Sequence, residues 1–242
     1  MKLRGLNFSE KAYDEIFEYI KNQFIEFKSK ELQENYYFIY IDAYHCMVKD
    51  LKDKRVKKAV VYTVVGIDTN AQKFLLGYYS FFGNENKSTW MEVFQDLINR
   101  GLKRALMFIS DDFKGISEAI KAYFPYSDIQ KCTVHLSRNV YKHMKKEDAS
   151  YVNKKFKEIK YSCDTYEKGL SIFQIEIIDK FKNQYPTYTK YLNSKKEEFL
   201  AFLKYPETIR KLINSTNAVE SVHSTFKSKG LKKVDFFSLW IY

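Results

Sequence analysis

The sequence predicts an α/β domain in which a sheet is combined with amphipathic helices. After an N-terminal helical segment, three strand-like apolar segments follow one another and are joined by short polar connections, which is typical of an antiparallel meander. Helical patterns then alternate with further short apolar segments, as in α/β domains. The chain has 242 residues, among them 20 Tyr and 20 Phe but only 8 Gly and 3 Pro, so it can fill a sizeable core.

A charged amphipathic helix is predicted over residues 8–33, with Ser9 as its N-cap. This helix is interpreted as an appendage. The first strand follows in NYYFIYIDAYHCMV, whose apolar residues occupy both faces, as in a central strand that is buried on two sides. Asp42 interrupts that strand with a charge.

Two more strands are predicted in VKKAVVYTVVGID and KFLLGYYSFF, with DTNAQ as the hairpin connection. The hydrophobic period then changes in KSTWMEVFQDLINRG, which predicts a helix with a capping box from Thr89 to Glu92 and an end at Gly101. Trp90 lies on the apolar face of this helix and is therefore assigned to the core.

A fourth strand in RALMFIS leads into a second helix that Pro125 ends, and SDIQKCTV predicts a fifth short strand. Helical patterns follow, for example at Tyr188, Leu192 and Phe199, until a final helix opens near Ser215. The predicted division is an N-terminal helical appendage, a sheet domain, a helical insertion and a closing helix, over residues 1–35, 36–136, 137–213 and 214–242, respectively.

The formal charge of +11 and an isoelectric point near 9.2 favour a polyanionic partner such as nucleic acid. The charge is uneven, because residues 131–160 hold nine Lys or Arg and three acidic residues, a net charge of +6. This segment predicts a local basic face. The alternative is that the Lys-rich composition only serves general solubility.

Three cysteines at wide spacing, Cys46, Cys132 and Cys163, argue against a disulfide framework and favour a reducing compartment. The N-terminus lacks the apolar stretch of a signal peptide, and no apolar run approaches the ~20 residues of a membrane helix. The sequence thus predicts a cytoplasmic protein without a membrane partner.

Three acidic residues stand where a sheet-and-helix domain could gather them: Asp42 in the first strand, Asp111 after the fourth, and Glu220 on the last helix. A charged Asp in an apolar strand is costly to bury unless it is paired or bound to a cation. Three carboxylates around two Mg²⁺ ions suit phosphodiester chemistry. The alternative for the pair Asp111 and Asp112 is a turn, because Asp often caps helices.

Several segments also resemble a known family. FISDDFKGISEAIKAYFPYSDIQKCTVHLSRNV looks like the central signature of Mutator-type bacterial insertion-sequence transposases, and STNAVESVHSTFKSKG resembles their closing motif around an acidic residue. The flanking IYIDAY, VVGIDTNAQKFLLGYY and NENKSTWMEVFQDLINRGLK agree in order. The resemblance covers residues 36–230, and the ordered combination is far more specific than any one segment.

The resemblance implies an RNase H-like mixed sheet flanked by helices, with a helical insertion before the last catalytic helix. It makes Asp42, Asp111 and Glu220 the catalytic residues and the ligands of two Mg²⁺ or Mn²⁺ ions. It further implies DNA as the partner, both element ends and target, action as a homodimer, and a location at the bacterial nucleoid. Asp112 falls where the family usually has Gly and is interpreted as a helix-start residue.

The segment CTVH matches a further element of this family. On the residues alone, Cys132 and His135 are interpreted as structural, because a zinc site normally takes four ligands and no second Cys/His pair is suitably spaced. With the resemblance, His135 is expected to support the scissile phosphate or the metal, and no zinc is assigned. Arg138 is either a phosphate contact or a solvated residue. Asn217 is expected to help position the last helix near DNA, and His223 is interpreted as a surface group.

The chain also departs from the family. Such transposases usually carry a long N-terminal DNA-binding region and continue beyond the acidic helix, so this chain is expected to be shortened at both ends. The first hypothesis is a transposase catalytic domain that cleaves and transfers DNA strands with a metal. The alternatives are a catalytically silent DNA-binding remnant of such a transposase and an RNase H-like nuclease that hydrolyses nucleic acid without joining it.

Overall fold

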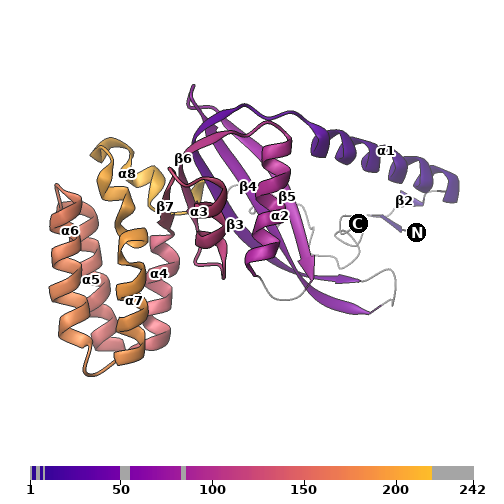
Figure 1. The fold of residues 1–242 in the computed structure, drawn as a ribbon. Coiled ribbons are helices and arrows are strands. Elements are labelled where there is room, and N and C mark those ends of the chain that lie inside the picture. The colour runs from indigo at the N-terminus through magenta and orange to yellow at the C-terminus, as the bar shows by residue number, and fades with distance from the viewer. Residues whose placement is uncertain (1, 4–5, 8, 50–54, 83–85, 220–242) are drawn as a thin grey trace.

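The computed structural model describes residues 2–3, 6–7, 9–49, 55–82 and 86–219, and its centre is a five-stranded sheet (Figure 1). The strand order is β5-β4-β3-β6-β7. β3, β4 and β5 pair antiparallel, whereas β6 is parallel to β3 and β7 is parallel to β6. This is the RNase H-like arrangement, so the predicted fold class is confirmed. The strands are β3 (Asn35–Lys49), β4 (Val56–Asp68), β5 (Lys73–Phe82), β6 (Arg104–Ser110) and β7 (Asp128–Lys131).

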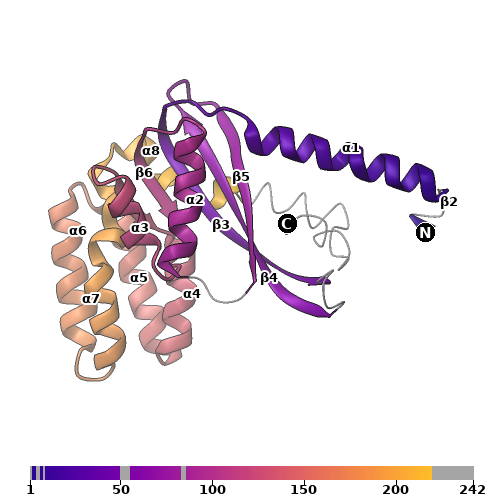
Figure 2. The ribbon, with the colours of Figure 1, turned by 45° about the vertical axis from the view of Figure 1, so that its right-hand side comes forward.

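The central strand β3 is buried on both faces, as its apolar residues of both parities predicted. Ile39 and Ile41 belong to the core on one face of the sheet, and Phe38 and Tyr40 belong to the core on the other. Helices therefore cover both faces (Figures 1 and 2).

On the first face lie α2 (Lys87–Asn99) and α3 (Ile116–Tyr123), which pack against the sheet and each other. Trp90 of α2 is fully buried, and its ring contacts those of Tyr62 and Phe113. The prediction that Trp90 belongs to the core is confirmed.

The second face is covered by the helices that follow β7, and these form a lobe at one end of the sheet (Figure 1). The lobe contains a short π-helical segment, η1, and one turn of 3₁₀-helix, η2. Among the described residues, the helices are all too short or too polar to span a bilayer. The elements are α4 (Thr133–His143), α5 (Lys146–Ser162), α6 (Tyr166–Phe173), η1 (Gln174–Asp179), α7 (Pro186–Leu200), η2 (Ala201–Lys204) and α8 (Glu207–Ile213).

The N-terminal helix α1 (Glu10–Ser29) extends away from the sheet (Figure 2). Its N-cap is Ser9, whose hydroxyl accepts a hydrogen bond of 3.1 Å from the backbone N–H of Ala12, as predicted. A two-stranded hairpin of β1 (Lys2–Leu3) and β2 (Leu6–Asn7) precedes it and was not predicted, because two-residue strands carry no hydrophobic period.

The predicted capping box of α2 is wrong. The N-cap is Asn86, whose side-chain oxygen accepts a 3.0 Å hydrogen bond from the backbone N–H of Thr89. Asn is as good an N-cap as Ser or Thr, so it starts the helix one turn before the position that Thr89 would have set. The end of the helix near Gly101 agrees with the prediction, and Gly101 has a positive φ of 112°.

Helix α3 begins after Gly115, which has a φ of 81°. A side chain at this position would also meet the start of α2, because a Cβ atom would lie 2.5 Å from the backbone nitrogen of Lys87. The helix thus starts at Ile116. The interpretation of Asp112 as a helix-start residue is therefore wrong.

Replacing Gly115 with Ala is expected to lower the free energy of unfolding by about 1–3 kcal/mol, because a non-Gly residue is strained in the left-handed region. Urea unfolding followed by circular dichroism measures this change. The exposed neighbour Lys114→Ala is the matched control and should leave the free energy unchanged. Equal unfolding curves for the two variants would contradict the expectation.

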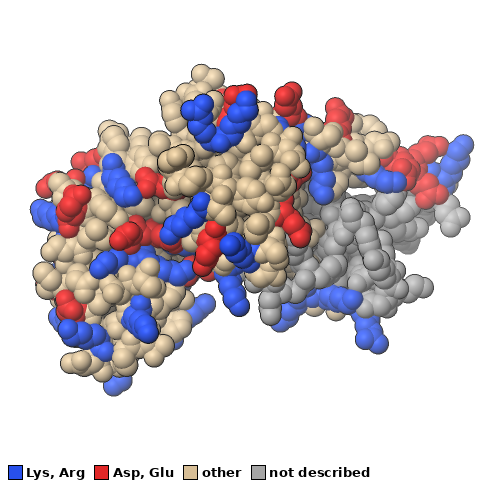
Figure 3. All heavy atoms as spheres, viewed as in Figure 1, with Lys and Arg blue, Asp and Glu red and all other residues tan. Residues whose placement is uncertain are grey.

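The basic segment 131–160 lies mostly in the helical lobe, and six of its nine Lys and Arg side chains are exposed. On the face seen in Figure 3, basic side chains are spread over the lobe among acidic ones and do not form one continuous patch. Lys131 is an exception, because it is buried. The exposed residues are Arg138, Lys142, Lys145, Lys146, Lys154 and Lys157.

Candidate active site

Two predicted acidic residues come together where the pairing between β3 and β6 ends. The last pair in this register is Ile41 with Ser110, so Asp42 and Asp111 follow at the same level of the sheet. Asp42 is only 7% exposed, and its Oδ1 accepts a 2.9 Å hydrogen bond from the backbone N–H of Ala43. The level at which the pairing between β3 and β6 ends therefore carries two carboxylates, one on each strand path.

The charge of Asp42 acts on Asp111. Burial raises the pKa of the Asp111 carboxyl group above its ordinary value, and the like charge of Asp42 adds to this rise, whereas His135 opposes it. Two carboxylates in this position repel each other in a partly dehydrated site. A cation between them would relieve the repulsion.

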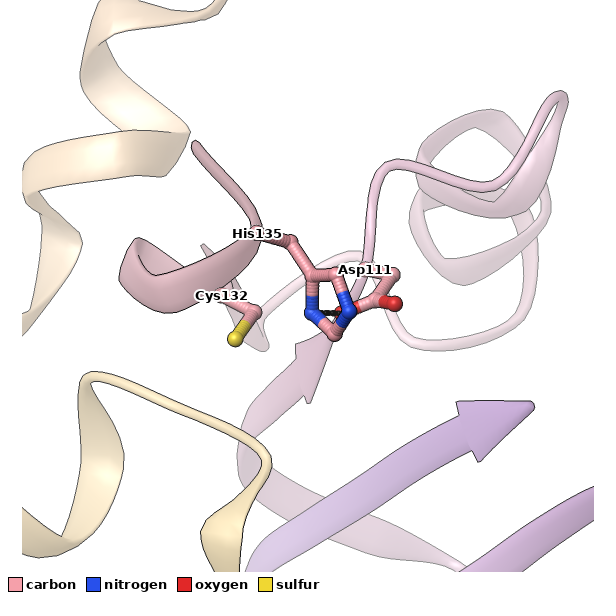
Figure 4. Close-up of side chains that lie close together, drawn as sticks. All are labelled: Asp111, Cys132 and His135. Carbon is pink, nitrogen blue, oxygen red and sulfur yellow. Dashed lines mark ion pairs between the residues drawn. The ribbon is translucent and has the colours of Figure 1, made fainter. Parts of the chain in front are cut away.

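His135 is the direct partner of Asp111 (Figure 4). Its Nδ1 lies 2.5 Å from Asp111 Oδ1. The close contact with the Asp111 carboxylate, and to a lesser extent the proximity of Cys132, raises the pKa of His135 to about 10, although burial opposes the rise. With Asp111 ionised, His135 is thus an imidazolium at neutral pH and neutralises part of the negative charge of the site.

Cys132 lies in the same cluster, at the point where the chain passes from the sheet into α4. Its backbone N–H donates a 2.8 Å hydrogen bond to the carbonyl of Ser110, and it is the N-cap residue of α4. One donor atom each from Asp111, Cys132 and His135 lies within 4.8 Å of the others. A carboxylate, a thiol and an imidazole make three of the four ligands that a structural zinc site requires, and the described residues add no fourth to this group.

The chain returns to this cluster just before its predicted third acidic residue. The backbone N–H of Thr133 donates a 2.9 Å hydrogen bond to the carbonyl of Asn214, and the hydroxyl of Thr216 lies 3.6 Å from Cys132 Sγ. Asn214 and Thr216 are buried, and the three residues after Thr216 are helical. Glu220 itself lies outside the described residues, and so does His223.

Two predicted supporting residues lie at the edge of the site. Arg138 is exposed, and its Nη1 is 3.5 Å from His135 Nε2. Asn217 is also exposed, at the start of the last described helical turn. The structure therefore gathers Asp42, Asp111, Cys132 and His135 in one place, with Arg138 beside them.

A network behind Asp111 was not predicted. Lys131 is 1% exposed, and its Nζ lies 3.4 Å from Asp112 Oδ1 and 3.9 Å from Glu198 Oε2. Asp112 also contacts Lys195 and accepts a 2.8 Å hydrogen bond from the Tyr191 hydroxyl.

The two cations also set the protonation state of Asp112. Burial alone would raise the pKa of this carboxyl group, but Lys131 and Lys195 outweigh burial and hold it below its ordinary value. The network fastens the Asp111–Asp112 segment to β7 and α7.

One signal for this network was present in the chain. Lys131 is a charged residue within the segment SDIQKCTV, which is predicted to be a strand, and Asp42 is likewise a charged residue within the first predicted strand. A charge in such a position needs a partner when it is buried. The partners Asp112 and Glu198 come from distant parts of the chain and could not be identified from spacing.

Comparison with known proteins identifies the family of this chain. A family model described as "Transposase, Mutator family" matches residues 1–237. The chain is 27% identical over 237 residues to the transposase for insertion sequence element IS905 of Lactococcus lactis, an alignment with 97% of this chain and 58% of that protein. It is 26% identical over 239 residues to the transposase for insertion sequence element IS1201 of Lactobacillus helveticus, covering 97% of this chain and 62% of that protein.

A shorter match, 28% identical over 141 residues, is to the transposase for insertion sequence element IS256 in transposon Tn4001 of Staphylococcus aureus, with 58% of this chain and 35% of that protein. The chain thus spans 58% and 62% of the length of the two relatives above that it matches almost throughout.

Proposed function

The chain belongs to the Mutator family of transposases, and from this premise we propose that its sheet domain cleaves and transfers DNA strands at the ends of an insertion sequence. The observation that supports this most strongly is the position of Asp42 and Asp111, side by side where β3 and β6 stop pairing. In this proposal the sheet domain is residues 36–136, the helical insertion is 137–213, and the closing catalytic helix lies in 214–242.

The side chains present fit a divalent cation. Asp42 and Asp111 offer oxygen ligands, which Mg²⁺ and Mn²⁺ prefer, and burial together with the like charge of Asp42 raises the pKa of Asp111. We assign these two residues as ligands, together with Glu220. When bound, the ions would supply positive charge to the attacking and leaving oxygens of a phosphodiester.

The neighbouring residues have supporting roles. The His135 imidazolium holds the Asp111 carboxylate in place through its Nδ1. Arg138, close to the outer nitrogen of His135, is positioned to contact a phosphate of DNA. The contact between Thr216 and Cys132 holds Thr216, which directly precedes the last described helical turn, at the site.

DNA binding in this proposal uses the exposed cations of the helical lobe. Neutralisation of phosphates by Lys and Arg provides affinity without sequence specificity and weakens as salt concentration rises. Action as a dimer on paired element ends stays a prediction from the family resemblance.

The test is incubation of the chain with labelled DNA that carries the ends of its own element, in Mg²⁺ or Mn²⁺. Products that are both cleaved and joined would support strand transfer. Cleaved products without joined ones would indicate a hydrolytic nuclease. Salt-sensitive binding without any metal-dependent product would show that this chain binds DNA without catalysis.

Replacing His135 with Asn is expected to slow cleavage about 10–100-fold, which is the usual effect of losing a group that orients a metal ligand. Asn keeps a hydrogen-bond donor near Asp111 but removes the positive charge. Cleavage rates at saturating metal measure the effect. Tyr161→Ala, an exposed change in the same lobe, is the control, and wild-type rates in His135→Asn would contradict the role.

A further inference from the structure

A cleft of about 540 Å³ opens between α4 and α7, directly beside the proposed active site. Asp112, the neighbour of Asp111 in the chain, forms part of its wall. Volumes of about 300–1,000 Å³ are typical of small-ligand sites. The residues that line the cleft include Asp112, Asn139, His143, Tyr185, Tyr188 and Tyr191.

Aromatic rings dominate the wall of this cleft. The rings of His143 and Tyr188 are stacked with centroids 4.7 Å apart and planes 6° apart. Tyr188 and Tyr191 are stacked at 5.7 Å and 20°. The three rings therefore form a stacked row that joins α4 to α7. Tyr185 is the N-cap residue of α7.

Hydrogen bonds hold these rings in place. The hydroxyl of Tyr188 donates to Asn139 Oδ1 at 2.9 Å, that of Tyr191 to Asp112 Oδ2 at 2.8 Å, and that of Tyr185 to Asp148 Oδ2 at 2.6 Å. Because the hydroxyl groups are engaged, the rings are held in fixed orientations in the cleft wall, where the buried Tyr188 is stacked with both His143 and Tyr191. Rigid aromatic walls of this kind bind flat ligands at low entropic cost.

We propose that this cleft takes one unpaired nucleobase of the DNA strand that is processed beside Asp111. This inference rests on the proposed function and adds a ligand site to it. Every base has a π-face, so stacking on aromatic side chains is independent of sequence. The amide of Asn139 lies at the same wall and can bond the edge of a base.

The surroundings suit a base that is still attached to its strand. Lys142 precedes His143 on α4, Lys190 precedes Tyr191 on α7, and both side chains are exposed. Both helices that form the cleft thus carry an exposed Lys next in sequence to a residue of its wall. Basic surfaces with aromatic side chains bind single-stranded DNA, with the backbone held by charge and the base by stacking.

The test uses duplex DNA that carries one unpaired 2-aminopurine at a strand end, in the presence of a chelator. Stacking quenches the fluorescence of this base. Binding of the wild-type chain is expected to quench the unpaired probe, and to change the fluorescence of the same base in a fully paired duplex much less. No metal and no cleavage are needed, so the result does not depend on the proposed chemistry.

His143 provides the variant, because its side chain is exposed and its loss should not affect folding. His143→Ala is expected to raise the Kd for the unpaired probe about tenfold and to leave the Kd for the paired duplex unchanged. His143→Phe keeps a ring and should retain quenching. Tyr141→Ala, on the same helix with 51% exposure but not part of the cleft wall, is the matched control.

Two outcomes would overturn the inference: equal fluorescence changes for unpaired and paired probes, or a His143→Ala variant that binds the unpaired probe like the wild type. If quenching follows the expected pattern and no cleavage is found with metal, the proposed function fails and the base site stands. If cleavage occurs and the cleft variants bind normally, the base site alone fails.

Discussion

Replacing Asp111 with Asn is expected to lower the rate of DNA strand cleavage by about a hundredfold or more, because the charge that a metal contributes to such a transition state is worth several kcal/mol. The change keeps the shape of the side chain and removes its negative charge. The pair of carboxylates formed with Asp42 is then reduced to one. Binding of duplex DNA should persist, since it depends on exposed Lys and Arg side chains.

Cleavage and binding are measured separately on the same labelled DNA, with and without Mg²⁺ or Mn²⁺. Asp42→Asn should have the same effect as Asp111→Asn, because the two acids occupy the same level of neighbouring strands. Asp164→Asn, an exposed acid in the helical lobe, is the control for the loss of one negative charge. Cleavage at the wild-type rate in Asp111→Asn would refute the assignment of the site.

The sheet could be predicted because its signals are local. β3 has apolar residues of both parities, β4 and β5 are joined by a short polar turn, and the helix after them changes the hydrophobic period. The N-cap residue of a helix is harder to predict from the sequence, since several residues near a helix start are able to cap it. Asn86 and Thr89 both qualify, and the backbone path before α2 decides between them.

The site was partly predictable for a similar reason. Asp42 is a charge inside an apolar strand and Asp111 is a charge at the end of another, and the pairing of the two strands brings these positions to the same level. The network around Asp112 depends instead on contacts between distant segments, because Glu198 and Lys195 lie on α7. Tyr185, Tyr188 and Tyr191 recur every third residue, yet this spacing is equally typical of a helix that packs in a core.

The largest expected change in stability is that of Lys131→Met, which should lower the free energy of unfolding by about 3–5 kcal/mol. Lys131 is buried at the end of β7 and lies between Asp112 and Glu198. Its removal leaves two carboxylates in a partly dehydrated place with one cation fewer. Breaking a buried ion pair costs far more than breaking an exposed one, because the remaining charge is no longer compensated.

Lys121→Met is the matched control, since Lys121 pairs with the same Glu198 at 3.4 Å but has a side chain that is 67% exposed. This variant should change the free energy of unfolding by about 0–1 kcal/mol in urea titrations. Equal effects of the two substitutions would mean that burial of Lys131 has no energetic consequence. Because Asp112 adjoins Asp111, a folded Lys131→Met protein should also cleave DNA more slowly than Lys121→Met, and this comparison tests whether the network positions the catalytic carboxylate as well as stabilising the fold.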